Sequence, residues 1–437
     1  MTAHRQIEAR LAAAGLPGLP RTAWLEIDLD ALSANLATLR AVVPAGVRVE
    51  PAVKADAYGH GAVPIAVALE AAGADGLCVA TFDEAVELRD AGVRLPVLVL
   101  FPVPPGWAAE AARRRIALTV GDPSLLERTL AVVREIAARG RPLRPALRLQ
   151  VEVETGLGRG GLPPAAVAPA AAAIGATRGA RLTGIWSHLA AAEDRARSRL
   201  QAERFAEVER LLAGDGLSVP PRHLAASGGL LAGSAAPLAA AGPGLALYGI
   251  VPEELTLAGA AAATARRLRP LMSLHARPVR VSELPAGSGV SYGPSFVTER
   301  RSLIATLPLG YGDGLARPLS NRAEALVRGH RVPLVGTIAM DAVMADVTDV
   351  PGPPVTVDDE FVLLGRQGSE RIAAVDLARA RTTISWEVVT AMARRLARVY
   401  TAGSVPVGLR TLTGWRVSWP ISSSGTATSA TSRSTRS

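Results

Sequence analysis

Lysine is almost absent from this 437-residue sequence. Lys54 is the only one, so the rest of the 48 basic residues are arginines. Arginine stays protonated at any workable pH, whereas a desolvated lysine can lose its proton and act as a nucleophile, a Schiff-base former or a general base. Lys54 also follows an apolar run and precedes a glycine-rich turn, where a surface cation would be out of place. A retained amine here indicates a chemical role; the alternative is chance survival in an arginine-rich composition.

Three other scarcities exclude whole classes of protein. The single cysteine, Cys78, cannot form an internal disulfide, which fits a reducing compartment and a small core residue. Aromatic residues make up only 4% and the arginines are scattered among acidic residues despite a net charge of +9, which argues against nucleic-acid binding. No apolar run approaches the ~20 residues of a membrane span, and no signal peptide is visible. We expect a cytoplasmic protein without membrane contact.

What is present is a regular alternation of apolar runs and helical stretches. Eight such runs over about 210 residues favour a closed (β/α)8 barrel of the TIM type over an open sheet, with active-site residues at the strand C-termini. We predict a leader at 1–20 and the barrel at 21–262, which includes an alternating strand at 21–30. The eight predicted barrel strands lie near residues 47–53, 76–80, 96–100, 116–120, 146–153, 182–186, 223–226 and 245–248.

The pattern changes beyond Pro270 to short alternating strands separated by glycine and proline. This predicts a β-rich domain at 263–400, which a helix at 386–399 closes. Residues 401–437 are predicted to form an extension, and its serine- and threonine-rich end, 422–437, is predicted to be disordered.

Polar residues and glycines gather at the predicted strand ends. A serine followed by two glycines and a later Gly-Leu pair offer backbone N–H groups and a hydroxyl for a phosphate. A lone Schiff-base lysine, a phosphate-binding loop and a histidine that could stack on a ring suggest pyridoxal phosphate. No histidine or cysteine cluster has metal-ligand spacing, so we expect no metal. The strand-end residues are Lys54, Tyr58, Arg159, His188, Ser227, Gly244 and Leu245.

Five motifs in order resemble the alanine racemase family over about residues 21–400. They are Ala-Val-Lys-Ala-Asp-Ala-Tyr-Gly-His-Gly at 52–61, Glu-Thr-Gly-Leu-Gly-Arg at 154–159, Ser-Tyr-Gly at 291–293, Gly-Tyr-Gly-Asp-Gly at 310–314 and Met-Asp at 340–341. The resemblance implies a pyridoxal-phosphate enzyme, built from a barrel and a C-terminal β domain, that racemises a small amino acid as a homodimer with shared active sites.

The resemblance also implies roles for individual residues. Lys54 would hold the cofactor as a Schiff base and act as one base, and Tyr292 from the partner subunit would be the second acid/base. The remaining implied roles are phosphate binding by Tyr58, Ser227, Gly244 and Leu245, ring stacking by His188, contact with the cofactor's phenolate oxygen and with the substrate by Arg159, and substrate entry and carboxylate binding by Tyr311, Met340 and Asp341.

Three positions depart from the family's pattern. Gly242 stands where the family usually has an arginine that faces the pyridine nitrogen. Glu152 replaces a lysine that is carbamylated in many members, and its carboxylate supplies the same negative charge beside Arg159. Trp386 replaces a tyrosine beside the cofactor phosphate and the substrate, so the position is cofactor-binding but without its hydroxyl.

These observations leave alternatives for the function. Racemisation of alanine for peptidoglycan is the leading hypothesis. Trp386 and Gly242 leave open a racemase of serine or another small amino acid. A catalytically weak pyridoxal-phosphate-binding paralogue is a third hypothesis, although both bases are present. Basic-amino-acid decarboxylases share a similar barrel but use a cysteine in the second domain, whereas Cys78 lies in the barrel.

Overall fold

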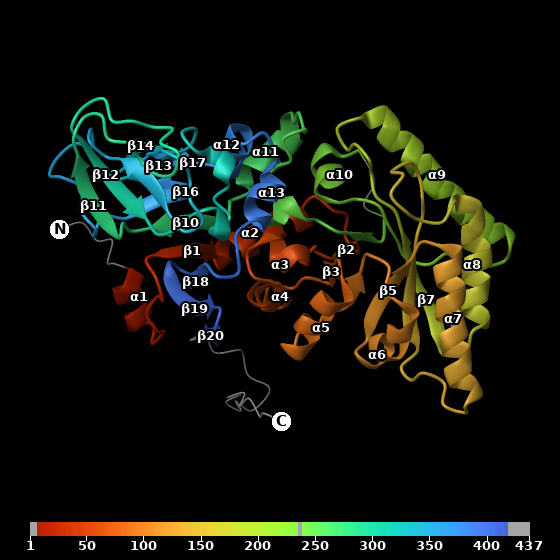
Figure 1. The fold of residues 1–437 in the computed structure, drawn as a ribbon. Helices are drawn as coiled ribbons and strands as arrows, with labels where there is room; N and C mark the ends of the chain where they lie inside the picture. Colours follow the sequence, from red (N-terminus) through yellow and green to blue (C-terminus); the bar gives the residue numbers. More distant parts are fainter. Residues whose placement is uncertain (1–6, 235–237, 418–437) are drawn as a thin grey trace, which may run out of the picture.

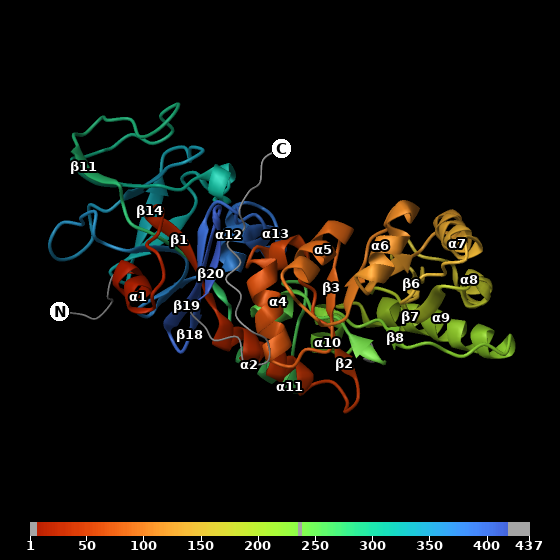
Figure 2. The same cartoon turned by 90° about the horizontal axis from the view of Figure 1, so that it is seen from below.

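The computed structural model describes residues 7–234 and 238–417, which form two bodies side by side (Figure 1). One is an eight-stranded parallel sheet surrounded by helices, and the other is built on a larger, mostly antiparallel sheet. Figure 2 shows the same division from below, with the long axis of the molecule running from one body to the other. The predicted fold class, a barrel followed by a mainly β domain, is confirmed.

The barrel sheet runs in the order β2-β9-β8-β7-β6-β5-β4-β3 within the described residues. An isolated parallel bridge between Ala52 and Cys78 joins its two end strands, so these two residues sit side by side at the barrel mouth. The strands are β2 (Arg48–Val49), β3 (Leu77–Val79), β4 (Val97–Val99), β5 (Ile116–Val120), β6 (Leu147–Glu152), β7 (Ala180–Trp186), β8 (Arg222–His223) and β9 (Ala240–Ala241).

The prediction of the eighth barrel strand was wrong. Residues 245–248 form a 3-10 helix, η2 (Leu245–Tyr248), and the eighth strand is the two-residue β9 that precedes it. All four residues of η2 are buried, and a short buried apolar run has no periodicity that separates a strand from a helical turn. Gly249, with φ of 78°, ends the turn in a left-handed conformation that glycine adopts at little cost.

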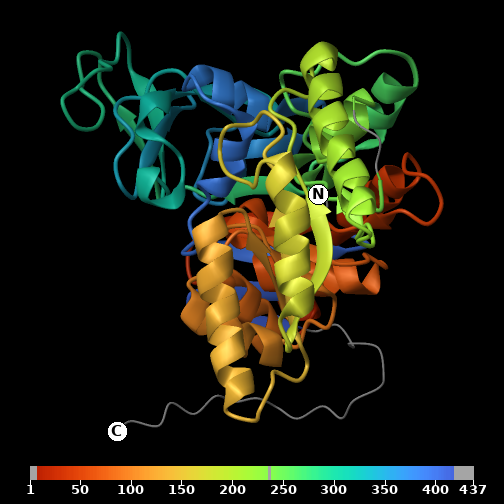
Figure 3. The ribbon, with the colours of Figure 1, turned by 90° about the vertical axis from the view of Figure 1, so that its right-hand side faces the viewer.

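Helices cover the outside of the barrel, and the first turns of α2, α5, α7 and α9 are capped by local side chains. Asp122 accepts a hydrogen bond from the Leu125 amide at 2.7 Å, and Thr81 forms a reciprocal capping box with Glu84. Figure 3 shows the three long helices α7, α8 and α9 along one side. The helices associated with the barrel are α2 (Leu29–Arg40), α3 (Lys54–Tyr58), α4 (Ala62–Ala71), α5 (Phe82–Asp90), η1 (Pro105–Trp107), α6 (Ala108–Arg113), α7 (Pro123–Ala138), α8 (Pro164–Ala176), α9 (Arg195–Gly214), α10 (Ser227–Ala232) and α11 (Gly259–Arg267).

The second sheet takes strands from both ends of the chain. Its β1, which lies inside the range predicted for the barrel, pairs with β10 on one side and β18 on the other. The strands are β1 (Ala23–Asp28), β10 (Met272–Ala276), β11 (Arg280–Leu284), β12 (Ser302–Leu307), β13 (Glu324–Val327), β14 (His330–Val335), β15 (Val343–Asp346), β16 (Phe361–Gln367), β17 (Glu370–Ile372), β18 (Ala397–Ala402), β19 (Val405–Thr411) and β20 (Gly414–Val417). The short helices of this body are η3 (Tyr311–Asp313), η4 (Arg317–Leu319), α12 (Ala374–Ala380) and α13 (Ser385–Thr390).

The predicted helix at 386–399 is also wrong for its second half. Only its beginning is helical, as α13, whereas the residues after it enter β18. The β18 pairing with β1 is a contact between the two ends of the chain, which local spacing does not reveal. Arg398 is fully buried there and donates to the carbonyl oxygens of Gly59, Met392 and Leu396. A buried arginine in an apolar stretch is tolerated because its donors are paired.

The ends of the described chain are structured. Residues predicted as a leader contain α1 (Ile7–Ala13), whose Ile7 and Leu11 pack against Trp24 of β1. Residues 401–417 continue the sheet through β19 and β20, while the predicted disordered segment 422–437 lies outside the described residues. In the described part of the chain, no helix has both the length and the apolar character needed to cross a bilayer.

Candidate active site

Lys54 begins a left-handed turn at the mouth of the barrel. The next four residues, Ala55 to Tyr58, have φ between 52° and 54°, although none of them is glycine. For L-residues this conformation places Cβ close to the following carbonyl oxygen and costs roughly 1–2 kcal/mol per residue. Four consecutive residues in this region indicate a backbone that the surrounding structure holds in place.

Charged side chains fix the exposed side of this turn. The Asp56 carboxylate accepts hydrogen bonds from the Ala62 amide at 2.9 Å and from the Arg410 guanidinium at 2.8 Å. Glu84 accepts from the Ala55 amide at 2.6 Å. Arg410 lies on β19, so the second body contributes directly to the backbone that carries Lys54.

His60 fixes the buried side. Its Nδ1 lies 2.9 Å from the carbonyl oxygens of both Ala57 and Tyr58, and the carbonyl oxygen of His60 accepts a hydrogen bond from the Tyr400 hydroxyl at 2.9 Å. Burial lowers the pKa of His60 to about 4, so its ring is neutral at physiological pH. Because two carbonyl oxygens face Nδ1, this nitrogen carries the ring proton.

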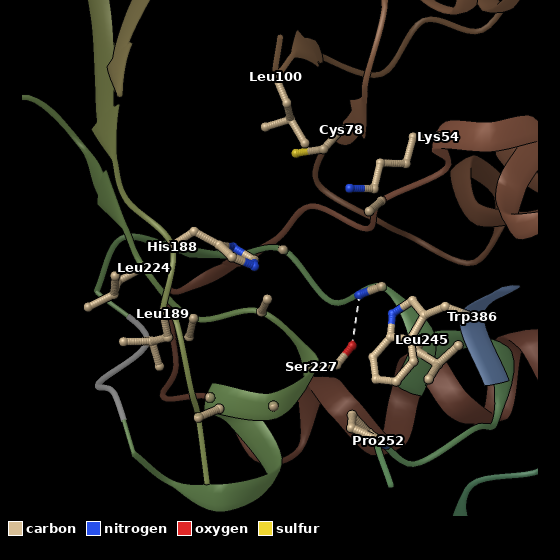
Figure 4. A pocket seen from close by; sticks show the side chains of 18 of the residues that line it. Lys54, Cys78, Leu100, His188, Leu189, Leu224, Ser227, Leu245, Pro252 and Trp386 are labelled. Carbon is tan, nitrogen blue, oxygen red and sulfur yellow. Dashed lines mark hydrogen bonds between the residues drawn. The ribbon is translucent and has the colours of Figure 1, made fainter. Parts of the chain in front are cut away.

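The Lys54 side chain enters a cavity of about 480 Å³ at the barrel mouth. Figure 4 shows its amine and the ring of His188 directed into the space beside Ser227 and Trp386. The structure therefore brings together every residue predicted to bind the cofactor. They are Lys54, Tyr58, Arg159, His188, Ser227, Gly244, Leu245 and Trp386.

One end of this cavity has the features of an anion site. The Ser227 hydroxyl oxygen accepts hydrogen bonds from the amides of Gly244 at 2.8 Å and Ala246 at 3.1 Å. A Cβ at Gly244 would lie 2.5 Å from the Tyr58 hydroxyl, so only glycine allows the tyrosine to approach. Ser227 also begins α10, whose first amides have no partners within the helix. The hydroxyl groups of Ser227 and Tyr58 and the first amides of α10 can donate to a phosphate group, whereas the Gly244 and Ala246 amides hold the Ser227 oxygen in place.

The charges in the cavity favour a neutral amine. Desolvation lowers the pKa of Lys54, and the nearby guanidinium of Arg159 lowers it further. Arg159 in turn donates to the Glu152 carboxylate at 3.2 Å, as we expected for this replacement. Burial, aided by the charges of Arg159 and Lys54, lowers the pKa of His188 to about 4, so this ring is neutral and can stack.

The other predicted residues lie elsewhere in the chain. Tyr292 is 74% exposed on the loop between β11 and β12, and it does not line the Lys54 cavity. Tyr311 and Met340 are also exposed, and Asp341 pairs with Arg395 at 2.7 Å. A single chain therefore does not bring these four residues to Lys54.

Cys78 and Phe101 are among the cavity residues that were not assigned to the site from the sequence. Cys78 was interpreted as a core residue, and it is buried, but it also lines the cavity beside Lys54. Its position at the end of the strand next to Lys54 was the available signal, since adjacent parallel strands end at the same edge. Phe101 was missed, and its ring lies 5.6 Å from the Arg159 guanidinium carbon.

The comparisons with known proteins match both bodies. Residues 27–252 match the family profile described as alanine racemase, N-terminal domain, and residues 271–400 match alanine racemase, C-terminal domain. The chain belongs to the alanine racemase family. No group of three or more potential metal ligands is found in the part of this family member that the structure describes.

The alignments with individual relatives cover most of this chain and nearly all of each relative. The alanine racemase of Symbiobacterium thermophilum is 40% identical over 382 residues, covering 87% of this chain and 97% of the relative. The crystal structure of alanine racemase from Bacillus anthracis with bound L-Ala-P has a TM-score of 0.82 and 30% identity, covering 91% and 99% of the two chains. That from Streptomyces lavendulae has a TM-score of 0.78 and 36% identity, covering 88% and 98%.

Proposed function

We propose that this chain is a pyridoxal-phosphate-dependent racemase that interconverts L-alanine and D-alanine. The supporting observation is the cavity at the barrel mouth, where the only lysine of the chain faces an anion site and a neutral histidine. Family membership supports the amino-acid racemase activity, and the residues of the cavity support the cofactor.

The cavity residues fit pyridoxal phosphate. Ser227, Gly244, Leu245 and Tyr58 would hold the phosphate, because they place a hydroxyl pair and backbone amides at one end. His188 would stack on the ring and Arg159 would bind the phenolate oxygen. When bound, the cofactor withdraws electrons from the substrate Cα, which makes its proton acidic.

Racemisation requires proton transfer on both faces of the substrate carbon. The Lys54 amine, whose pKa desolvation lowers, takes or returns the proton on one face. Tyr292 of the partner subunit serves the opposite face, since this side chain is 74% exposed and does not line the Lys54 cavity of its own chain. Tyr311, Met340 and Asp341 would accompany it at the substrate entry. We therefore propose a homodimer with shared active sites.

The proposed cellular role is that of a cytoplasmic enzyme that supplies D-alanine for peptidoglycan. This role follows from the proposed reaction and from family membership.

An enantiomer-resolved assay tests the proposal. The purified, cofactor-loaded protein is incubated with L-alanine, and D-alanine is measured by chiral chromatography beside a known racemase. We expect conversion toward equal amounts of both enantiomers; no D-alanine formation under conditions where the control works would refute the proposal. Loss of the visible absorbance of bound cofactor in Lys54→Ala tests the attachment separately.

The second candidate is a racemase of serine or another small amino acid. Trp386 supports it, because it lines the cavity without the hydroxyl of the family's tyrosine and so reshapes the space for the substrate side chain. A panel of small amino acids decides between the two: alanine turned over best by a wide margin excludes this candidate. Turnover of none would favour the cofactor-binding paralogue.

A further inference from the structure

A serine, a histidine and a glutamate form a hydrogen-bonded chain in the second body. His275 Nδ1 lies 2.8 Å from the Glu360 carboxylate, and its Nε2 lies 2.7 Å from the Ser273 hydroxyl oxygen. Ser273 and His275 are two residues apart on β10, so both side chains lie on one face of the sheet. Glu360 immediately precedes β16, which pairs with β10. None of the three residues lines the cavity that holds Lys54.

The neighbours of His275 fix the orientation of its ring and the direction of these hydrogen bonds. Trp24 of β1 is fully buried and stacks on the ring, with centroids 5.4 Å apart and planes inclined by 12°. An ionised carboxylate only accepts hydrogen bonds, so Nδ1 carries the ring proton and donates to Glu360. Nε2 is then the acceptor for the Ser273 hydroxyl. This order is that of a nucleophile, its general base and the group that orients the base.

The serine of this chain faces a cavity. Ser273 is half-buried and lines a space of about 840 Å³, together with residues of β16, α11 and α12 at the junction of the two bodies (Figure 1). Gly365 lines the same junction cavity, and a Cβ at this glycine would lie 2.7 Å from the Ser273 Cβ. The missing side chain therefore leaves space beside the serine. Glu26, the cross-strand partner of Ser273, is paired with Arg10 at 2.8 Å, so its negative charge is compensated.

The walls of the junction cavity suit an acyl chain. Its volume lies within the range of small-molecule sites. A carboxylic ester presents an apolar acyl chain together with an electrophilic carbonyl carbon, and a hydroxyl nucleophile with a general base reacts with such a carbon. The apolar residues that line the cavity include Leu268, Leu271, Met272, Leu364, Ile372 and Val389.

From this geometry we propose that Ser273 is the nucleophile of a second site, which hydrolyses short-chain carboxylic esters. Ser273 Oγ attacks the ester carbonyl carbon while His275 Nε2 takes the hydroxyl proton. This proton passes to the alcohol oxygen as the bond between that oxygen and the carbonyl carbon breaks. Water then attacks the acyl group on Ser273 and gives a proton to the same nitrogen. The carboxylic acid leaves as this proton returns to Oγ.

Covalent labelling tests the nucleophile directly. The cofactor-loaded protein is treated with a biotin-linked fluorophosphonate, and the labelled residue is identified by peptide mass spectrometry. We expect one phosphonyl group on Ser273, with fluoride displaced. His275→Gln keeps a hydrogen-bonding side chain but removes the base, so it should slow labelling by about 10²-fold or more. A protein that is not labelled at Ser273, or that is labelled equally fast in His275→Gln, overturns the proposal.

A second variant covers the case in which His275→Gln does not fold. The Glu360 side chain is 35% exposed, so Glu360→Gln changes a less buried position. It leaves the base without its carboxylate and should slow labelling of Ser273 by about tenfold or more. Unchanged labelling in this variant overturns the proposed chain.

Turnover is measured with p-nitrophenyl butyrate, from the absorbance of the released nitrophenolate. Ser273→Ala should abolish hydrolysis above the buffer rate, whereas Ser33→Ala, at an exposed position on α2, should leave it unchanged. Hydrolysis that persists undiminished in Ser273→Ala comes from another residue and overturns the proposal. A chain that only stabilises the sheet would give neither labelling nor hydrolysis. Since neither measurement depends on racemisation, this proposal and the proposed racemase function fail separately.

Discussion

Lys54 lies in a cavity lined by its own chain, whereas Tyr292 is 74% exposed on a loop of the other body. The same contrast holds for their neighbours. Ser227 and Tyr58 are buried beside Lys54, while Tyr311 and Met340 are 43% and 52% exposed. The difference teaches that one chain completes the proposed cofactor half of the site and only displays the proposed substrate half.

The largest expected effect on activity comes from the cofactor half of the site, which is buried within one chain. Lys54→Ala should reduce kcat for alanine racemisation by about 10⁴-fold or more, because one base and the cofactor attachment are both lost. Lys54→Arg is the matched variant, since it keeps a cation but cannot act as a base. Substantial activity in either variant, measured by the enantiomer-resolved assay, would show that Lys54 is not the proposed base.

A change in the substrate half of the site, which is exposed in one chain, should give the next largest loss of activity. Tyr292→Phe should reduce kcat by about 10²–10⁴-fold, because it removes one proton-transfer group and keeps the ring. Mixing this variant with Lys54→Ala and allowing subunits to exchange tests whether the site is shared. Half of the dimers would then contain one intact site, which restores roughly a quarter of the wild-type activity. No recovery in mixtures that do exchange subunits would contradict a shared site.

The pH dependence of the unfolding free energy should distinguish a buried histidine from an exposed one. Burial lowers the pKa of His60 to about 4 in the folded state, so the unfolded chain binds a proton first as the pH falls. The stabilisation is complete above about pH 6.5 and is lost as the pH falls toward 4, by about 1.4 kcal/mol per pH unit. Chemical denaturation at several pH values measures it. His188 and His223, whose pKa values burial also lowers to about 4, contribute in the same pH window. His60→Gln should therefore reduce the slope by about 1.4 kcal/mol per pH unit without abolishing it, and His330→Gln, at an exposed position on β14, should leave it unchanged.

The smallest expected effect concerns the left-handed turn. Ala55 is exposed with φ of 52°, so Ala55→Gly should stabilise the folded chain by about 1 kcal/mol. Ala37→Gly, at an exposed position in the right-handed helix α2, should destabilise it by about 0.5–1 kcal/mol. Equal signs for the two variants, measured as unfolding free energies, would mean that the turn is not held in a costly conformation.

The sequence predicted the buried half well because strand ends of a barrel meet at one mouth. Once Lys54, Ser227 and His188 were placed at strand ends, their proximity followed from the fold. The β18 pairing and the position of Arg398 could not be predicted in this way, since they depend on contacts between distant segments. The left-handed turn was equally hidden, because none of its four residues is glycine and two of them are alanines, which do not favour this conformation.

The exposed half shows a different limit. The motifs around Tyr292, Tyr311 and Asp341 were visible in the sequence, but they do not meet Lys54 within one chain. Their proposed roles therefore depend on a second chain. A pattern of residues can identify a proposed site without stating how many chains build it.

The placement of β1 between β10 and β18 bears on how the protein is made. β1 leaves the ribosome well before its neighbours β10 and β18. The barrel is synthesised in between and can close on local βα contacts, while the second sheet must wait until β18 has been made. Such pairings of high sequence separation are slow to form. A chain cut between the two bodies would separate β1 from both neighbours, so the β domain should not fold as an isolated fragment that begins at residue 263.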